Sequence, residues 1–169
     1  MQVFLETGRL ILRRFTGDDV DLLVELDADP EVMRYINGGE PTSRAEVVDE
    51  VLPAFLDYYE RYPGYGFWAA IEKSTGEFLG WFHFRPPHGG RDDEAELGYR
   101  LRKSAWNKGY ATEGSRALID KGFIEYGVNR VFATTMAANV GSRRVMEKSG
   151  LSYVRTFFGD WPESMPGNA

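Results

Sequence analysis

The sequence predicts an α/β fold in which helices cover both faces of a mixed, mostly antiparallel sheet. The first observation is the order of patterns: a strand, several helices, three strands joined by short connections, and then an alternation of helix and strand. Short connections favour antiparallel neighbours, whereas a helix between two strands allows a parallel pair. The second is composition, because 43% of the 169 residues are hydrophobic and 14% are aromatic, which is ample for a core. A chain of this length is expected to form a single domain over residues 1–169.

The first expected elements are a strand and a helix. Leu10 and Leu12 lie two residues apart, and therefore on one face of a strand that runs to Phe15. Thr16 or Asp18 is expected to cap the helix that follows, because its side chain can accept from the first free amides of that helix.

Two more helices are expected before the next strand. Pro30 suits the first turn of a short helix that stops at the glycines of residues 38–39. Ser43 and Glu46 have the spacing of a capping box at the start of a longer helix. Pro53 lies inside that pattern and is expected to kink or split the helix, because proline has no N–H to donate.

The second half of the chain alternates strands with turns and helices. The expected elements, in chain order, are a strand over residues 66–72, a turn over 73–77, a strand over 78–84, a loop over 86–93, a strand over 94–102, a helix that ends at Tyr126, a strand over 131–136, a helix over 139–149 and a strand over 153–158. The helix that ends at Tyr126 is expected to bury one face, formed by Ala111, Ser115, Leu118, Ile119, Gly122, Phe123 and Tyr126.

Composition narrows the classes of function. The chain has no cysteine and two histidines, His83 and His88, so a thiol nucleophile, a disulfide framework and a metal cluster are not expected. The net charge of −6 argues against a general nucleic-acid binder. The sequence has no apolar run long enough to span a membrane and no signal-peptide layout, so we expect a cytoplasmic protein that does not associate with membranes.

Residues 106–115 have the pattern of an anion site. A strand leads into a turn flanked by Lys103 and Lys108, and Gly109 precedes a long helix. The first amides of a helix lack partners and the helix dipole favours negative charge there, so such a turn can bind a phosphate group. Basic residues gather in this half of an acidic chain, which suits a small anionic ligand. They are Arg100, Arg102, Lys103, Lys108, Arg116, Arg143, Arg144 and Lys148.

Two blocks of sequence resemble a known family. The first joins Glu96-Leu97-Gly98-Tyr99-Arg100-Leu101 to Trp106-Asn107-Lys108-Gly109-Tyr110-Ala111-Thr112-Glu113, and the second runs from Asn139 to Gly150. Together they resemble the GNAT acyltransferases, and within them the RimJ/RimL-type ribosomal-protein N-terminal acetyltransferases, over the chain from Thr7 to Tyr153. The resemblance implies a GNAT fold with two splayed strands, acetyl-CoA as the acyl donor and an amine as the acceptor.

The resemblance assigns the turn after the strand to the pyrophosphate of the acyl-CoA, held mainly by backbone amides. The residues implied at this site are Leu101, Arg102, Lys103, Trp106, Asn107, Lys108, Gly109, Tyr110, Ala111 and Thr112. Gly109 and Ala111 match the two small positions of the family signature. Trp106 stands where the general family has Arg or Gln, and Asn107 stands at a position often held by glycine. Backbone amides and Lys108 are therefore expected to bind the diphosphate.

Three further residues are assigned to the cofactor. Gly98 lies inside a strand, which indicates a bulge or a close backbone approach. The resemblance implies that pantetheine lies where the two strands splay apart, with an amide near Gly98 donating to the thioester carbonyl. Asn139 is expected to cap its helix and, by resemblance, to contact the pantetheine amide. Arg143 or Arg144 is expected to bind the 3′-phosphate.

Two residues are candidates for the chemistry. An aliphatic amine must lose a proton before it attacks, and a carboxylate acting through water can accept that proton. Glu96 is the first candidate because it shares a strand face with Gly98, and Glu94 is the second. Met146 stands where many family members have the tyrosine that protonates the leaving thiolate. Ser142, one helical turn earlier, takes that role by resemblance.

Several alternatives stay open at this point. The leading function is an acetyl-CoA-dependent N-acetyltransferase that acts by direct attack in a ternary complex, and the alternative is a non-catalytic acyl-CoA-binding module. The acceptor is a protein N-terminus or a small-molecule amine, and the donor an acetyl or a longer acyl group. The family's final strand is missing after residues 153–158, so the chain is truncated, its sheet edge is exposed, or a partner chain fills that edge. The oligomeric state stays open, and a homodimer is one alternative. The acceptor pocket is expected to draw on Met33, Tyr35, Tyr58, Tyr59, Tyr62, Phe67, Trp68, Trp81 and His83.

Overall fold

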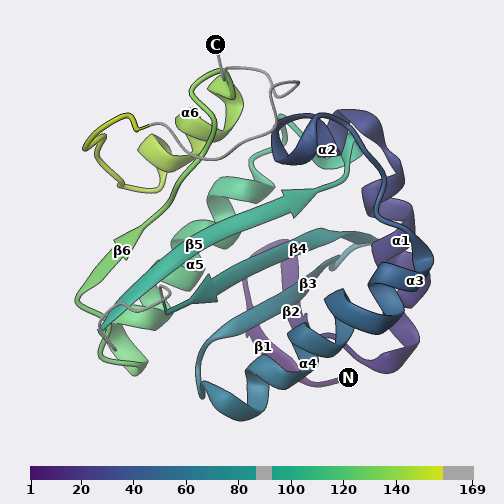
Figure 1. Cartoon of the computed structure of the whole chain (residues 1–169). Coiled ribbons are helices and arrows are strands. Elements are labelled where there is room, and N and C mark those ends of the chain that lie inside the picture. Colours follow the sequence, from purple (N-terminus) through teal and green to yellow (C-terminus); the bar gives the residue numbers. More distant parts are fainter. Residues whose placement is uncertain (87–92, 158–169) are drawn as a thin grey trace.

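The computed structural model describes residues 1–86 and 93–157 of the chain. Six strands form one sheet, and their spatial order is their order along the chain (Figure 1). Neighbouring strands are antiparallel except for the last two, which are parallel because a helix connects them. The strands are β1 (Val3–Glu6), β2 (Leu10–Arg14), β3 (Gly66–Glu72), β4 (Phe78–Arg85), β5 (Glu94–Leu101) and β6 (Arg130–Phe132). The predicted mixed, mostly antiparallel sheet is confirmed.

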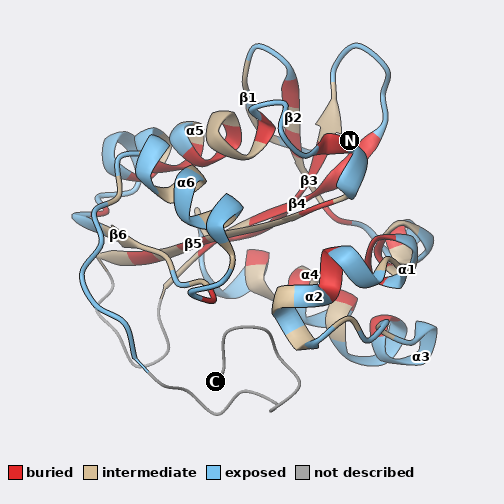
Figure 2. Ribbon diagram, turned by 90° about the horizontal axis from the view of Figure 1, so that it is seen from above, coloured by how far each residue is buried: buried red, intermediate tan, exposed pale blue. Residues whose placement is uncertain are grey.

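Helices cover both faces of the sheet. Figure 2 shows α5 and α6 on one face and α1 to α4 on the other. The helices are α1 (Val20–Ala28), α2 (Pro30–Asn37), α3 (Arg44–Glu46), α4 (Leu52–Arg61), α5 (Tyr110–Glu125) and α6 (Val140–Lys148), with short helical turns η1 (Gly17–Asp19), η2 (Val47–Val51) and η3 (Lys103–Ala105). None of the described helices is long and apolar enough to cross a membrane.

Each face of the sheet has its own core, because side chains alternate along a strand. In β4, Phe82 and Phe84 belong to the core under α5, whereas Trp81 belongs to the core under α1, α2 and α4. α5 approaches the sheet closely at two glycines. A Cβ atom on Gly114 would lie 2.4 Å from the Phe82 ring, and one on Gly122 would lie 2.6 Å from the Phe84 ring. This packing fixes the position of α5 and of the turn that precedes it.

The predicted buried face of α5 is correct for its central part and wrong at its end. Ser115, Leu118 and Ile119 are buried, whereas Phe123 and Tyr126 are 47% and 38% exposed. Gly122 faces the sheet, so the next residue is turned about 100° away from it. The ring of Tyr126 lies beside that of Phe4 instead, at 6.2 Å between centroids.

Pro53 interrupts the longer helix of the first half, as its position predicts. Just before it, the Leu52 amide donates to the Val47 carbonyl five residues back, so η2 is a single π-helical turn. Pro53 itself then lies in the first turn of α4, where its missing N–H costs no intrahelical bond.

The helix caps agree with the predictions in part. Ser43 accepts from the Glu46 amide at 3.1 Å, so it is the predicted cap. The complete reciprocal capping box is found at Thr16 and Asp19 instead, at the start of η1.

Three strand predictions need correction. The sequence pattern does not predict β1, which pairs with β2 along one edge of the sheet. The strand expected over residues 131–136 is the shorter β6, because β6 separates from β5 and none of the described residues pairs with those that follow. Residues 153–157 form no strand, and Tyr153 and Val154 are each 77% exposed because no apolar surface covers them. Residue 158 lies outside the described residues.

We expect Gly114→Ala to lower the free energy of unfolding by about 1–2 kcal/mol, because overpacking against Phe82 outweighs the better helix propensity of alanine. Gly141 in α6 is the matched control, since a Cβ there meets its nearest atom at 3.9 Å. Gly141→Ala should therefore raise stability by up to about 1 kcal/mol. Urea denaturation measures both, and an equal rise in the two variants would contradict the close packing of α5.

Candidate active site

β5 and β6 pair over three residues and then separate. Pairing ends at Glu96 and Phe132. β5 continues to Leu101, and no described residue pairs with it on this side. Figure 1 shows the chain leading from β6 away from β5 toward α6. The edge of β5 beyond Glu96 therefore presents backbone N–H and C=O groups to an extended ligand, which is the splayed geometry that the resemblance implies.

The turn between β5 and α5 presents a row of free amides. Asn107 and Gly109 have positive φ angles of 60° and 84°, and alternation of this kind forms an anion-binding nest. No amide of residues 107–112 has an acceptor among the described residues. The start of α5 adds the positive end of the helix dipole. The turn can therefore bind a phosphate group through its backbone, and Asn107 suits its position because Asn tolerates a positive φ.

Two aromatic side chains shape this turn from within. Trp106 donates its indole N–H to the Leu101 carbonyl at 2.9 Å, which closes the chain at the end of β5. Tyr110 is buried and donates its hydroxyl to Glu72 on β3. Both side chains are therefore occupied by protein partners, and Tyr110 keeps a free amide.

The basic side chains of the turn differ in their partners. Arg102 lies 2.8 Å from a carboxylate oxygen of Glu77, and Lys103 forms an ion pair with Glu31. Both side chains therefore already have an acidic partner. Lys108 is exposed and forms no ion pair among the described residues, so its charge is available to an anion.

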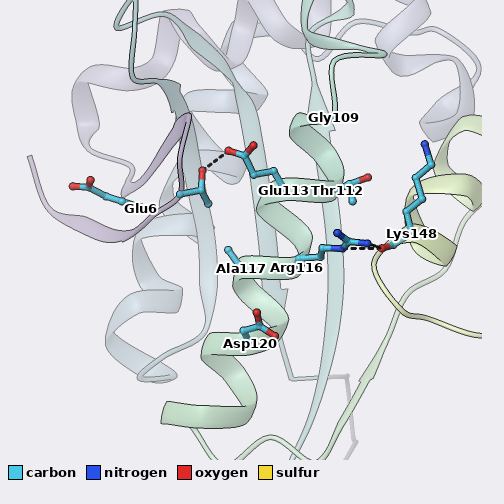
Figure 3. A pocket seen from close by; sticks show the side chains of 9 residues that line it. Glu6, Gly109, Thr112, Glu113, Arg116, Ala117, Asp120 and Lys148 are labelled. Atoms are coloured by element: carbon cyan, nitrogen blue, oxygen red, sulfur yellow. Dashed lines mark hydrogen bonds between the residues drawn. The ribbon is translucent and has the colours of Figure 1, made fainter.

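Arg9, in the first half of the chain, contacts and stabilises this turn. The sequence did not lead us to predict this role for Arg9. Its Nε lies 2.8 Å from Glu113 Oε1, and its terminal nitrogen donates to the Lys108 carbonyl at 2.9 Å. The guanidinium also lies 4.2 Å from the centroid of the Tyr110 ring. Thr7 donates to the other oxygen of Glu113 at 2.5 Å (Figure 3). The signal for Arg9 is its place at the beginning of the region that resembles the family.

An open depression of about 630 Å³ lies along α5 beside this turn (Figure 3). Gly109, Thr112, Arg116 and Lys148 contribute to its lining, together with the carboxylates of Glu6, Glu113 and Asp120 and with Thr7 and Ala117. Arg116 Nε donates to the Lys148 carbonyl at 2.8 Å, which joins α5 to the end of α6. Two cations therefore lie at the edge of the depression next to the free amides.

The start of α6 lies on the α5 side of the sheet. Asn139 accepts from the Ser142 amide at 3.1 Å, so the predicted cap is confirmed. Arg143 donates to the Ala137 carbonyl at 3.2 Å. Burial raises the pKa of Tyr99, and a hydrogen bond with the Ser142 side chain opposes that rise. Ser142 is therefore next to Tyr99 on this face of β5.

Glu96 lies on the opposite face of β5, next to two side chains of β4. Its Oε1 is 3.3 Å from His83 Nε2 and 3.2 Å from a terminal nitrogen of Arg85. The close approach of His83 Nε2, together with the charge of Arg85, lowers the pKa of Glu96 against the opposing effect of burial. The carboxylate is therefore ionised at neutral pH.

Gly98 is explained by a side chain rather than by a bulge. The β4–β5 register is continuous and places His83 opposite Gly98, where a Cβ atom would lie 2.3 Å from His83 Cε1. The rings of Phe67 and Trp81 enclose the imidazole at centroid distances of 5.3 and 5.9 Å. Burial lowers the pKa of His83, so its imidazole is neutral at neutral pH. The close approach predicted at Gly98 is that of the imidazole.

The aromatic residues expected at the acceptor pocket lie on two faces. Trp68 is 1% exposed and stacks on Phe4 in the core under α5, so it is not on the face of Glu96. Tyr59 donates to the Phe67 carbonyl, and burial raises its pKa to about 12, as expected of a core residue. The aromatic members on the face of Glu96 are Tyr58, Phe67, Trp81 and His83. No group of three or more metal-binding side chains is present in the described part of the chain.

Comparison with known families agrees with this geometry. The family model of the acetyltransferase (GNAT) domain matches residues 9–152, which include strands β2 to β6, the turn before α5, and α6. The chain belongs to the GNAT acetyltransferase family. It is accordingly an acetyltransferase, and acetyl-CoA is the donor that this family uses.

Individual relatives show how far the similarity extends. The FsC-acetyl coenzyme A-N(2)-transacetylase of Aspergillus fumigatus is 34% identical over 172 residues, which cover 98% of this chain and 72% of that protein. A GNAT acetyltransferase structure from Bacillus anthracis has a TM-score of 0.69 at 28% identity and covers 89% of this chain and 82% of that one. The RimL ribosomal L7/L12 alpha-N-protein acetyltransferase in complex with coenzyme A has a TM-score of 0.73 at 18% identity, covering 88% and 82%. That last likeness is one of fold, so these matches do not single out the RimJ/RimL branch.

We expect Gly98→Ala to lower the free energy of unfolding by about 1–3 kcal/mol, because the new methyl group collides with His83. In a His83→Ala background, the loss of unfolding free energy caused by Gly98→Ala should be smaller by at least about 1 kcal/mol, because the colliding ring is absent. Urea denaturation of the wild type, the two single variants and the double variant measures this coupling. Additive costs would show that some other contact requires glycine at this position.

Proposed function

We propose that this enzyme transfers the acetyl group of acetyl-CoA to a primary amine by direct attack within a ternary complex. The observation that supports this most is the separation of β5 and β6 after Glu96. The unpaired strand edge runs from an ionised carboxylate toward the free amides before α5. An extended donor with a thioester at one end and phosphates at the other suits this arrangement.

In this proposal the donor binds mainly to backbone groups. The diphosphate accepts from the amides of residues 107–112, and Lys108 supplies the neighbouring charge. Pantetheine lies along the free edge of β5 and contacts the Asn139 side-chain amide, whose oxygen already serves the cap. Arg143 binds the 3′-phosphate after leaving the Ala137 carbonyl. Arg102, Lys103 and Trp106 then contribute through the shape of the turn, since their side chains have protein partners.

The chemistry requires one proton to leave the amine and one to reach the sulfur. Glu96 accepts one proton of the ammonium group through a water molecule, and the neutral nitrogen attacks the thioester carbon. As the tetrahedral intermediate collapses, the C–S bond breaks, and the further proton that the nitrogen loses passes to the sulfur. An amide of β5 near Gly98 donates to the oxyanion. Ser142, next to Tyr99, relays this proton to the leaving thiolate or orients the sulfur, which is a weak base and needs little assistance.

The acceptor in this proposal is a small-molecule amine or a protein N-terminus. The relative named FsC-acetyl coenzyme A-N(2)-transacetylase supports transfer to a nitrogen atom, and the RimL neighbour is named for a protein α-amine. A second candidate function is a non-catalytic acyl-CoA-binding module. It is favoured by Met146, which cannot donate a proton where many family members have tyrosine.

A thiol-release assay with acetyl-CoA and a panel of amines and short peptides tests the proposal. We expect at least one amine to stimulate release of free coenzyme A with matching formation of an acetylated product. Tight binding of acetyl-CoA without release by any amine or peptide would favour the non-catalytic module.

Glu96→Gln should lower kcat/KM for the amine by about 100-fold or more, because general-base catalysis contributes on that scale. The control is Glu94→Gln, since the side chains of Glu94 and Glu96 are 21% and 22% exposed on the same strand. Glu94 lies where β5 still pairs with β6, 3.7 Å from Arg130, so its loss should leave the rate close to that of the wild type. The assay is initial-rate kinetics at saturating acetyl-CoA, and equal losses in both variants would remove Glu96 from the base role.

Asn107→Gly should bind acetyl-CoA with nearly unchanged affinity, because glycine adopts the φ of 60° at this position without strain. Asn107→Val should bind roughly tenfold more weakly, because a left-handed conformation costs an ordinary residue about 1–2 kcal/mol and the free turn then relaxes out of the nest. Isothermal titration calorimetry measures both dissociation constants. Equal affinities would show that the backbone nest does not hold the donor.

A further inference from the structure

His83 is a buried titratable group that the proposed chemistry does not use. Neither imidazole nitrogen has a well-aligned hydrogen-bond partner among the described residues. Nε2 nevertheless lies 3.3 Å from Glu96 Oε1, which is within reach of a hydrogen bond after a small rotation. Buried polar groups are normally paired, so this position requires a reason.

Packing prevents the imidazole from moving away from β5. On one side, the position of a Gly98 Cβ would be 2.3 Å from Cε1 and 2.6 Å from Nε2, so the ring edge rests on the bare Cα. Phe67 and Trp81 enclose the ring from neighbouring positions. The glycine therefore allows His83 to come close to β5 beside Glu96, at the point where β6 separates.

We infer that His83 is a positioning residue for acetyl transfer, whose imidazole donates Nε2–H to Glu96 and holds that carboxylate at the opening between β5 and β6. This inference rests on the proposed role of Glu96 as the base. Both ring nitrogens are closed off from solvent, so His83 acts through Glu96 rather than on the amine.

A neutral donor suits this role better than a second cation. Arg85 already places a positive charge 3.2 Å from the same carboxylate oxygen. A further charge would weaken Glu96 as a base, whereas a neutral imidazole orients the carboxylate without adding charge. Burial and the neighbouring Arg85 and Arg100 all oppose protonation of His83.

The groups that face the pair come from three elements. Arg85 is on β4, Arg100 is on β5, Tyr58 is on α4, and Tyr62 directly follows that helix. Arg100 is itself paired with Asp27 of α1 at 2.9 Å. Burial raises the pKa of Tyr58, so this phenol stays neutral in the working range of pH. Of these groups, Glu96 and His83 are therefore the ones that become protonated as the pH falls along the acid limb of the activity profile.

Kinetics of two variants test the inference. His83→Phe keeps a ring of similar shape and removes the donor, whereas His83→Gln keeps a donor near the position of Nε2. We expect His83→Phe to lower kcat by about 10–100-fold, the scale seen when an orienting partner is lost, with KM for acetyl-CoA unchanged. His83→Gln should recover a large part of this loss.

The pH profile separates positioning from simple packing. The His83 imidazole beside the carboxylate lowers the pKa of Glu96, so loss of this donor should raise that pKa. Activity needs the ionised carboxylate and is lost as pH falls through that pKa. The acid limb of kcat/KM should therefore move to higher pH in His83→Phe and move back in His83→Gln.

Nitrogen-15 NMR of the imidazoles gives a readout that does not depend on turnover. The chain has two histidines, so a His88→Gln variant assigns the signals of His83. We expect His83 to be neutral, with Nε2 protonated and Nδ1 bare. Glu96→Gln should shift the Nε2 resonance, and the matched Glu94→Gln should leave it unchanged.

Several results would overturn the inference. They are a charged imidazole, an Nδ1-protonated tautomer, an Nε2 resonance indifferent to Glu96→Gln, or a wild-type pH profile in His83→Phe. The NMR measurement uses protein that keeps His83, so it tests the inference even if a His83 variant fails to fold. If Glu96→Gln abolishes turnover while His83 shows no coupling to Glu96, the inference fails and the proposed function stands. If no amine is acetylated, the proposed function fails, and the role of His83 fails with it.

Discussion

The loss of pairing between β5 and β6 after Glu96 is the constraint on which the rest of the site depends. Parallel neighbours normally share a continuous ladder, and backbone groups left without one must find another partner. β5 is held firmly on its other edge, where it pairs with β4 from Glu96 to Leu101. The opening is therefore one-sided. β5 stays in the sheet, while the segment after β6 moves away and leaves room for an extended ligand.

The anion-binding turn follows from the same arrangement by way of backbone geometry. β5 ends at Leu101, Trp106 closes the chain against that residue, and α5 begins once Gly109 has adopted a positive φ. Gly114 allows α5 to lie against the sheet, and Arg9 ties the start of α5 to the N-terminal segment. The amides are thus oriented before any ligand arrives. A turn built in this way needs few side chains for its ligand, which is why Trp106 is compatible with it.

The sequence was informative wherever local pattern and local structure coincide. The strand, turn and helix around Gly109, the cap at Asn139 and the shared face of Glu96 and Gly98 depend on near neighbours, and the structure has all of them. The shortened β6 and the irregular residues 153–157 depend on whether a partner strand is present, which strand propensity does not encode.

Contacts between distant segments were also beyond the local pattern. Arg9 contacts Glu113, and Gly98 contacts His83, only because β2, β4 and β5 share one sheet. The glycine was predicted to permit a close approach, but the group that approaches comes from another strand. Phe123 illustrates the same limit, since its exposure is set by the contact of Gly122 with Phe84.

Alternation along β5 has a further consequence for the proposed reaction. Glu96 and His83 lie on one face of the strand, and Tyr99 with Ser142 lies on the other. The intervening strand therefore keeps the proposed base apart from the group beside the sulfur. The proton of the amine and the proton for the sulfur are then handled on separate faces. The backbone near Gly98 lies between the two faces, at the edge where β6 has separated. The carbonyl carbon of a donor bound along that edge is therefore accessible from both faces of β5.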